Sequence, residues 1–261
     1  MNPELNIISL TVKGTGHSVN EDNLCVGSNY VVVADGMGGE SAGDIASKIV
    51  VESVEKNIKG VEFEKLDEKA IKSLMAELIE KADEEIIKYI DSHPDCYGMG
   101  TTILMAIFNK DKLTMAWCGD SRCLLIKDRK VKSLTKDHSV VQELIDAGKI
   151  TEEESFSHPD NNVITRYVGG GKESCMPDFT SYSIGGGDVI IFCSDGLSGY
   201  CFENEIMQCI EARKEEDWVS ALKDLALQKG SEDDITIVTL SKNYFPSKSR
   251  KGFFSSLFSR K

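Results

Sequence analysis

The order in which strand-like and helix-like stretches follow one another constrains the fold of this 261-residue chain more than any other feature. Residues 103–108 and 113–118 are apolar runs separated by a polar turn at 109–111, and strand patterns recur at 123–127 and 131–134. Short apolar runs joined by tight turns are typical of antiparallel strands, because a parallel pair needs a crossover of a dozen or more residues. The centre of the chain is therefore predicted to be an antiparallel meander.

Helical patterns occur in two pairs, one on each side of this meander. Residues 41–58 and 67–91 carry apolar side chains at the spacing of one helix face, and residues 203–212 and 215–228 repeat that pattern. The remaining strands are predicted at 6–12, 24–26, 30–34, 179–184, 188–193 and 235–240. Single strands and helices do not alternate along the chain, so we predict an α+β fold of antiparallel sheets with helices packed outside them.

One of these strands ends at an acidic residue. The apolar run from Tyr30 to Val33 predicts a buried strand, and Asp35 follows it, with glycine at positions 36, 38 and 39. A carboxylate beside apolar residues needs a positive partner, and a metal ion is one candidate. A strand followed by a turn that Asp35 caps explains the same residues without a metal.

Four further segments place an acid at the end of an apolar strand or in a glycine turn. They are Asn20-Glu21-Asp22, Cys118-Gly119-Asp120-Ser121, Ser194-Asp195-Gly196 and Glu232-Asp233-Asp234. The chain has only four histidines, so this set of oxygen ligands favours hard cations such as Mg²⁺ or Mn²⁺. Two such ions about 3.5–4 Å apart can produce a bound hydroxide and stabilise an in-line displacement at phosphorus.

Composition excludes several other classes of protein. The formal charge of −13 disfavours nucleic acid as a partner. No run of eighteen apolar residues occurs and the N-terminus lacks the pattern of a signal peptide, so we expect a cytoplasmic protein without a membrane span. The eight cysteines contain no CxxC pair, and we expect reduced thiols rather than zinc ligands or disulfides.

Residues 242–261 differ from the rest of the chain. They hold six Lys or Arg residues and no acid, and removing these six charges from −13 leaves −19 for residues 1–241. The aromatic run at 252–258 lies among these basic residues. Both a disordered tail and a basic aromatic element that contacts an anionic membrane or a partner protein fit this composition.

Seven short motifs, in this order, resemble those of the metal-dependent protein phosphatase 2C family in its compact bacterial form. They are Asn20-Glu21-Asp22, Ala34-Asp35-Gly36-Met37-Gly38-Gly39, Gly98-Met99-Gly100-Thr101-Thr102, Gly119-Asp120-Ser121-Arg122, Lys136-Asp137-His138-Ser139, Ser194-Asp195-Gly196-Leu197 and Asp233-Asp234-Ile235-Thr236. The resemblance covers roughly residues 10 to 240. It implies a β-sandwich flanked by pairs of helices, a phosphatase domain over 1–241, and a flap insertion at 139–168 beside the active site.

The resemblance also implies roles for individual residues. The ligands of two core Mn²⁺ or Mg²⁺ ions would be Asp22, Asp35, which bridges the ions, the Gly36 carbonyl, Asp195 and Asp233. Glu21 would act through water, and Asp120 with Asp195 resembles a third, weaker metal site. The implied reaction is hydrolysis of phosphoserine and phosphothreonine in proteins by a hydroxide that the two ions activate. We also expect the protein to be a monomer. A catalytically weak or silent module that binds phosphoproteins is the alternative.

Three positions depart from the family pattern. His17 stands where many members have an arginine that binds the substrate phosphate, and a histidine could bind phosphate more weakly or make a local hydrogen bond only. Met37 replaces a histidine that other members are thought to use as a proton donor, so a metal-bound water or His17 must serve instead. Asp234 replaces the usual asparagine, which adds charge near the cluster without removing a ligand.

Overall fold

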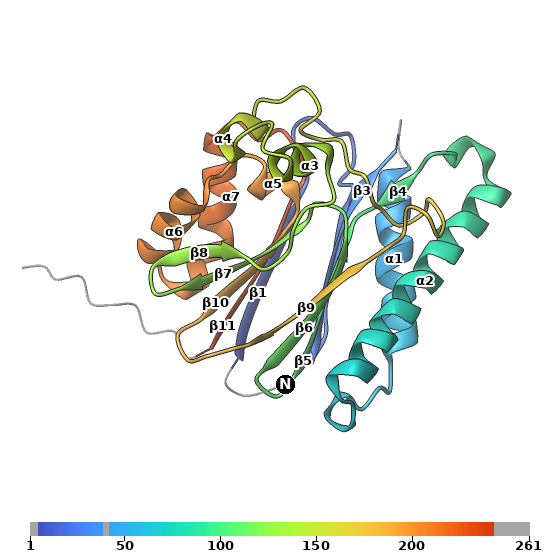
Figure 1. Ribbon diagram of the computed structural model, residues 1–261, viewed down its shortest axis with the longest axis horizontal. Coiled ribbons are helices and arrows are strands. Elements are labelled where there is room, and N and C mark those ends of the chain that lie inside the picture. Colours follow the sequence, from blue (N-terminus) through green and yellow to red (C-terminus); the bar gives the residue numbers. More distant parts are fainter. Residues whose placement is uncertain (1–4, 39–41, 243–261) are drawn as a thin grey trace, which may run out of the picture.

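The computed structural model describes residues 5–38 and 42–242, and in it two antiparallel sheets pack face to face between layers of helices (Figure 1). The strands of the first sheet, in spatial order, are β1 (Leu5–Val12), β11 (Ile235–Lys242), β10 (Val189–Cys193), β7 (Arg122–Lys127) and β8 (Lys130–Ser133). Those of the second are β2 (Asp22–Val26), β3 (Tyr30–Met37), β5 (Ile103–Asn109), β6 (Lys112–Cys118) and β9 (Asp178–Ser183), with the short β4 (Gly100–Thr101) paired to β3. The predicted α+β sandwich is confirmed.

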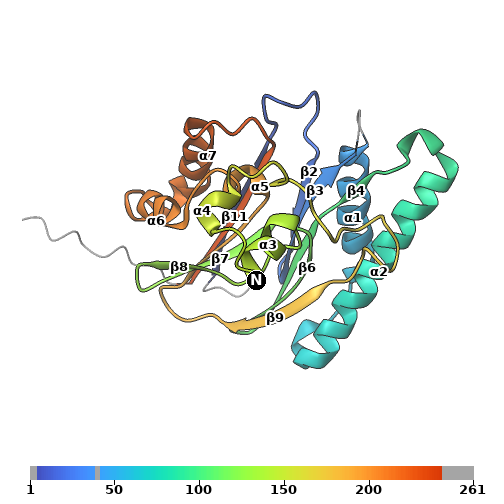
Figure 2. The same cartoon turned by 45° about the horizontal axis from the view of Figure 1, so that its top comes forward.

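Helices cover the outer face of each sheet (Figures 1 and 2). The second sheet is covered by α1 (Gly43–Ile58) and α2 (Glu68–Ser92), and the first by α6 (Glu203–Glu211) and α7 (Trp218–Gln228). The shorter helices are α3 (Val140–Asp146), α4 (Glu152–Ser155) and α5 (Asp195–Ser198), and 3₁₀ turns occupy Phe63–Lys65, Pro94–Cys96 and Glu215–Asp217. Along the described chain, no helix combines the length and the apolarity that crossing a bilayer requires.

Alternation along the strands divides the apolar interior into three layers. On β3, Val31 and Val33 face the other sheet, whereas Val32 between them packs against α1 and α2. On β10, Phe192 points between the sheets and Ile191 packs against α6 and α7. Strands that are buried on both faces read as continuous apolar runs, which explains why the central strands were visible in the sequence.

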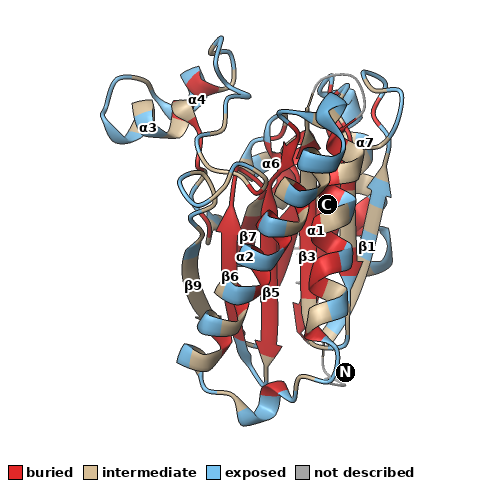
Figure 3. Cartoon of the chain, turned by 90° about the vertical axis from the view of Figure 1, so that its right-hand side faces the viewer, coloured by how far each residue is buried: buried red, intermediate tan, exposed pale blue. Residues whose placement is uncertain are grey.

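The connection from β8 to β9 carries α3 and α4, which lie beyond one end of the sandwich (Figures 1 and 3). Each of these short helices begins at a capping hydroxyl, from Ser139 for α3 and Thr151 for α4. This region contains the segment 139–168 predicted to be a flap, and both that role and the limits of the phosphatase domain stay predictions. Lys242 is the last residue of β11, and the rest of the predicted tail lies outside the described residues.

Several short elements differ from the sequence expectation. Helix α5, strand β4 and the 3₁₀ turns at 63–65 and 94–96 were not predicted, because two to four residues are too few to show a period. The helix expected at 215–228 is a 3₁₀ turn followed by α7, which begins at Trp218.

Candidate metal centre

The sequence-predicted carboxylates converge at one end of the sandwich. Asp22 at the start of β2 and Asp35 near the end of β3 are direct partners across the antiparallel ladder. Asp195 follows β10 and Asp233 precedes β11, and these neighbouring antiparallel strands bring both residues to the same end. Asp120 lies in the turn between β6 and β7. Residues that are up to 211 positions apart in the chain therefore form one acidic cluster.

This cluster carries more negative charge than its surroundings compensate. Burial raises the pKa of Asp22 to about 7 and that of Asp195 to about 6. The pKa values of Asp35 and Asp120 lie well above the usual range, first because both carboxyl groups are buried and second because other carboxylates of the cluster repel their charge. Burial also raises the pKa of Asp233. Carboxylates held together in this way bind protons or cations strongly.

Hydroxyl groups and a glycine fix the backbone around Asp35. The amide of Asp35 donates to Thr102 Oγ1 at 3.0 Å, and its carbonyl accepts from the Thr101 hydroxyl and the Thr102 amide, both at 2.8 Å. A Cβ atom on Gly36 would lie 2.0 Å from the carbonyl oxygen of Gly43 at the start of α1. Only glycine fits here, so the Gly36 backbone stands next to the cluster with no side chain covering it.

Ser194 connects the two sheets at the cluster. Its hydroxyl donates to Asp22 Oδ2 at 2.7 Å and accepts from the Thr236 amide at 3.0 Å. Asp22 belongs to one sheet and Thr236 to the other, so this hydroxyl sets the distance between them. The motif containing Ser194 was noted in the sequence, but its role was missed because only the folded chain brings Asp22 within reach.

A cleft of about 310 Å³ lies between the cluster and the segment that carries α3 and α4. Its lining residues are Asp120, Arg122, Asp137, Val141, Ser155, Phe156, Asn161, Asn162, Asp195, Ser198, Gly199, Tyr200 and Asp233. The cation of this lining, Arg122, makes a bidentate ion pair with Asp137, with Nη2 2.7 Å from Oδ2. Arg122 is therefore already paired and does not neutralise the acidic cluster by itself.

His17 lies at the edge of this cluster. Its Nδ1 is 2.9 Å from Asp234 Oδ2 and 3.7 Å from Asp233 Oδ1. The hydrogen bond to Asp234 raises the pKa of His17, and burial raises that of Glu21. Asp234 Oδ2 also accepts from the Glu21 amide, which links His17 and Glu21 through one carboxylate. The structure thus brings every predicted site residue to the same end of the sandwich, and it adds Asp234 as a common partner.

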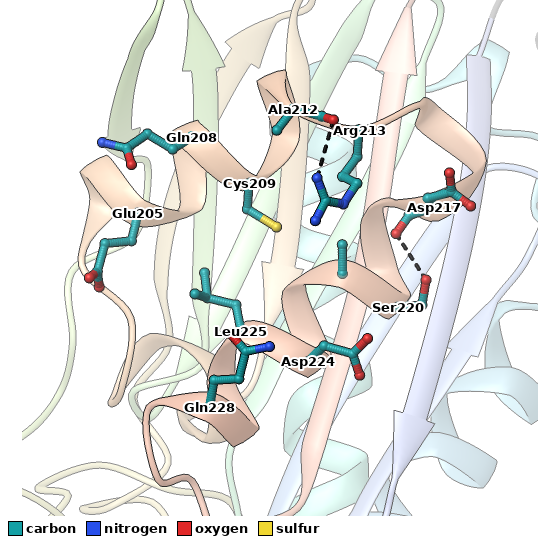
Figure 4. A pocket seen from close by; sticks show the side chains of 11 residues that line it. Glu205, Gln208, Cys209, Ala212, Arg213, Asp217, Ser220, Asp224, Leu225 and Gln228 are labelled. Carbon is teal, nitrogen blue, oxygen red and sulfur yellow. Dashed lines mark hydrogen bonds between the residues drawn. The ribbon is translucent and has the colours of Figure 1, made fainter.

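A second and larger hollow, of about 540 Å³, is a groove between α6 and α7 (Figure 4). Glu205 and Cys209 of α6 face Asp224 and Leu225 of α7 across it. Two of its three acids have cationic partners, since Lys229 contacts Glu205 and Lys223 lies 2.7 Å from Asp224. The groove lacks the convergent unpaired carboxylates of the cleft, so size alone does not identify the reactive site.

The donor set of the cluster fits hard divalent cations. Five carboxylates in a partly buried site with raised pKa values provide oxygen ligands and a charge that two divalent ions would offset. Asp35 is electrostatically coupled to Asp22, Asp120, Asp195 and Asp233, and this central place suits a bridging ligand. Asp120 is most strongly coupled to Asp195, the pair expected to form a third site.

Comparison with known proteins identifies bacterial protein phosphatases, several of which are named serine/threonine phosphatases. The family model described as Protein phosphatase 2C matches residues 13–144. The serine/threonine phosphatase stp of Listeria monocytogenes is 32% identical over 243 residues, covering 89% of this chain and 94% of the relative. PstP of Mycobacterium tuberculosis is also 32% identical, over 87% of this chain, but the chain spans only 43% of its length.

Solved structures give the same result. Stp1 from Staphylococcus aureus superposes with a TM-score of 0.85 at 30% identity, over 91% of this chain and 94% of that one. The catalytic domain of PstP in complex with two manganese ions gives a TM-score of 0.81 at 29% identity, over 91% and 97%. Motif order, fold and these matches agree, and the chain belongs to the protein phosphatase 2C family.

Proposed function

We propose that this chain is a Mn²⁺- or Mg²⁺-dependent phosphatase that hydrolyses phosphoserine and phosphothreonine in proteins. The observation that carries the proposal is the cluster of five carboxylates with raised pKa values, three of which line an open cleft. The relatives' names and the two manganese ions bound by PstP support it. We further propose that it acts in the cytoplasm as a monomer, on proteins that a serine/threonine kinase has phosphorylated.

In this proposal, the groups that would hold two core ions are Asp22, Asp35, Asp195, Asp233 and the Gly36 carbonyl, and Asp120 with Asp195 would be available for a third. When bound, the ions would supply a hydroxide nucleophile at neutral pH and offset the charge of the transferring phosphoryl group.

The chain's own residues have separate tasks in the reaction. Asp35 lies at the centre of the carboxylates that would bind the ions, and Glu21 would act on them through water. His17, whose side chain is 39% exposed, is available to contact a phosphate oxygen. The cleft next to Asp233 admits the phosphorylated side chain. Phe156 of the flap segment packs on Phe202, with ring centroids 4.5 Å apart, and this contact holds the segment over the cleft.

The test is hydrolysis of p-nitrophenyl phosphate and of a phosphothreonine peptide with added Mn²⁺, against a chelator control. Asp35→Asn and Asp233→Asn should each abolish turnover, whereas circular dichroism should show that both variants keep the fold. Turnover like that of the wild type in both variants would refute the assignment. A wild-type protein that binds the phosphopeptide but never hydrolyses it would favour the alternative, a silent phosphoprotein-binding module.

The tail proposal concerns residues outside the described part of the chain. Its basic and aromatic composition supports contact with an anionic membrane surface or with a partner protein.

A further inference from the structure

We propose that Asp234 is a positioning residue for the reaction: it fixes the imidazole of His17 and the loop around it through three hydrogen bonds that only a carboxylate can accept together. This inference rests on the function proposed above, because that function assigns His17 to contact with the substrate phosphate and Asp234 would hold His17 in place.

The three hydrogen bonds come from different parts of one loop. Asp234 Oδ1 accepts from the Gly14 amide at 2.7 Å, and Oδ2 accepts from the Glu21 amide at 2.6 Å. The third partner is His17 Nδ1, 2.9 Å from Oδ2. One side chain, only 2% exposed, therefore holds the beginning, the middle and the end of the loop that separates β1 from β2.

The loop lies directly on the segment that leads into β11. The Gly16 amide donates to the Glu232 carbonyl at 2.7 Å, and a Cβ atom on Gly14 would lie 2.3 Å from the carbonyl carbon of Asp233. Because Asp233 is a proposed metal ligand and Asp234 follows it, the loop is built onto the cluster itself. A shift of Asp234 would move His17 and Glu21 relative to Asp233.

Asp234 also determines which nitrogen of His17 is available. A carboxylate only accepts hydrogen bonds, so Nδ1 must carry the hydrogen that it donates to Oδ2. Among the described residues, Nε2 of His17 has no hydrogen-bond partner. The pairing therefore leaves Nε2 free for a ligand and prevents Nδ1 from competing for it.

Asparagine cannot replace this carboxylate. A side-chain amide offers one acceptor oxygen and one NH₂ group that only donates. Whichever way that amide is turned, its NH₂ group faces a backbone N–H, that of Gly14 in one orientation and that of Glu21 in the other. The presence of aspartate at this position is thus matched to histidine at position 17.

The experiment compares Asp234→Asn, His17→Gln and the double variant by steady-state kinetics on p-nitrophenyl phosphate at saturating Mn²⁺. Outer hydrogen-bond partners at metal sites typically contribute 10–100-fold to activity, and we expect a loss of about that size in kcat/KM for Asp234→Asn. If Asp234 acts through His17, the double variant loses clearly less than the product of the two single losses. Fully multiplicative losses would overturn the proposal.

Asp188→Asn is a matched control. Asp188 is also 2% exposed, and its Oδ2 accepts from the Gly185 amide and the Tyr182 hydroxyl, both at 2.7 Å, at the opposite end of β10. Its replacement should lower stability while kcat/KM stays within about twofold of the wild type. An equal loss of activity in this control would show that weakened packing alone explains the effect, and would overturn the proposal.

A spectroscopic measurement is independent of activity. The ¹⁵N shifts of His17 in the wild-type protein above the pKa of the ring should report hydrogen on Nδ1, and this signature should be lost in Asp234→Asn. Hydrogen on Nε2 in the wild type would overturn the inference, even if the variant fails to fold. If the wild type hydrolyses no phosphoester with Mn²⁺, the proposed function falls, whereas the ¹⁵N signature still tests the pairing.

Discussion

Without bound metal, this protein should become less stable as the pH rises. This is the opposite of ordinary acid denaturation, in which stability falls as the pH is lowered. The cause is the carboxylate cluster, whose members bind protons more strongly when folded than when unfolded. A carboxyl group with a raised folded pKa contributes stability below its unfolded pKa, and loses it as the pH rises through the folded pKa. Asp22 and Asp195 should therefore lose their contribution to stability between about pH 4 and pH 8.

The magnitude follows from the two pKa values. Between pH 5.5 and 7.5, a shift from 3.8 to about 7 at Asp22 removes about 2 kcal/mol, and the shift to about 6 at Asp195 removes about 1 kcal/mol. The two groups interact, so about 3 kcal/mol is an upper value for this pair alone. Asp35, Asp120 and Asp233, whose pKa values are also raised, add to the loss in the same direction. His17, whose pKa is also raised, adds to the loss in the same direction.

The assay is urea unfolding of the chelator-treated protein at pH 5.5 and pH 7.5, with the same pair of measurements in excess Mn²⁺. Since metal binds only deprotonated carboxylates, Mn²⁺ should stabilise the protein more at pH 7.5 than at pH 5.5. Asp22→Asn keeps an oxygen acceptor for Ser194 but cannot titrate, and should reduce the pH dependence of the metal-free protein by the share of Asp22, about 2 kcal/mol. Metal-free protein that is equally stable or more stable at pH 7.5 would refute the reasoning.

Three further outcomes are expected. Phe192→Ala should lower the free energy of unfolding by about 3–5 kcal/mol in urea titrations, because this fully buried ring fills the space between the sheets; a loss below about 1 kcal/mol would contradict that packing. Gly36→Ala should weaken Mn²⁺ binding by calorimetry, since the new Cβ would meet the Gly43 carbonyl at 2.0 Å; unchanged affinity would show that α1 can move freely. Deletion of residues 243–261 should leave turnover of p-nitrophenyl phosphate unchanged while it alters binding to anionic vesicles or to partner proteins, measured by co-sedimentation; unchanged association would argue against the tail proposal.

The fold class was predictable because its signals are local. The continuous apolar runs of β5 and β6 and the polar turn between them identify an antiparallel pair from neighbouring residues alone. The periodic apolar faces of α1 and α2 likewise require no distant partner. Helix α5 was missed because its four residues are too few to show a local period.

The proposed metal ligands were visible in the sequence only as repeated acids at strand ends, and the order of seven motifs turned that repetition into a family resemblance. Sequence alone thus determined the residue types of the proposed centre, including Asp35 followed by Gly36, whereas the need for glycine at position 36 became apparent only in the structure.

The tertiary structure decided how these residues support one another. Asp234 reaches Gly14 across 220 positions because antiparallel pairing of β1 with β11 brings the two ends of the domain together. Ser194 reaches Asp22 across 172 positions because the two sheets pack face to face. In the sequence Asp234 was only an extra charge beside a ligand. In the fold its two carboxylate oxygens accept three hydrogen bonds. The sequence did not show them, because contacts over such distances depend on strand order and register, which local patterns do not contain.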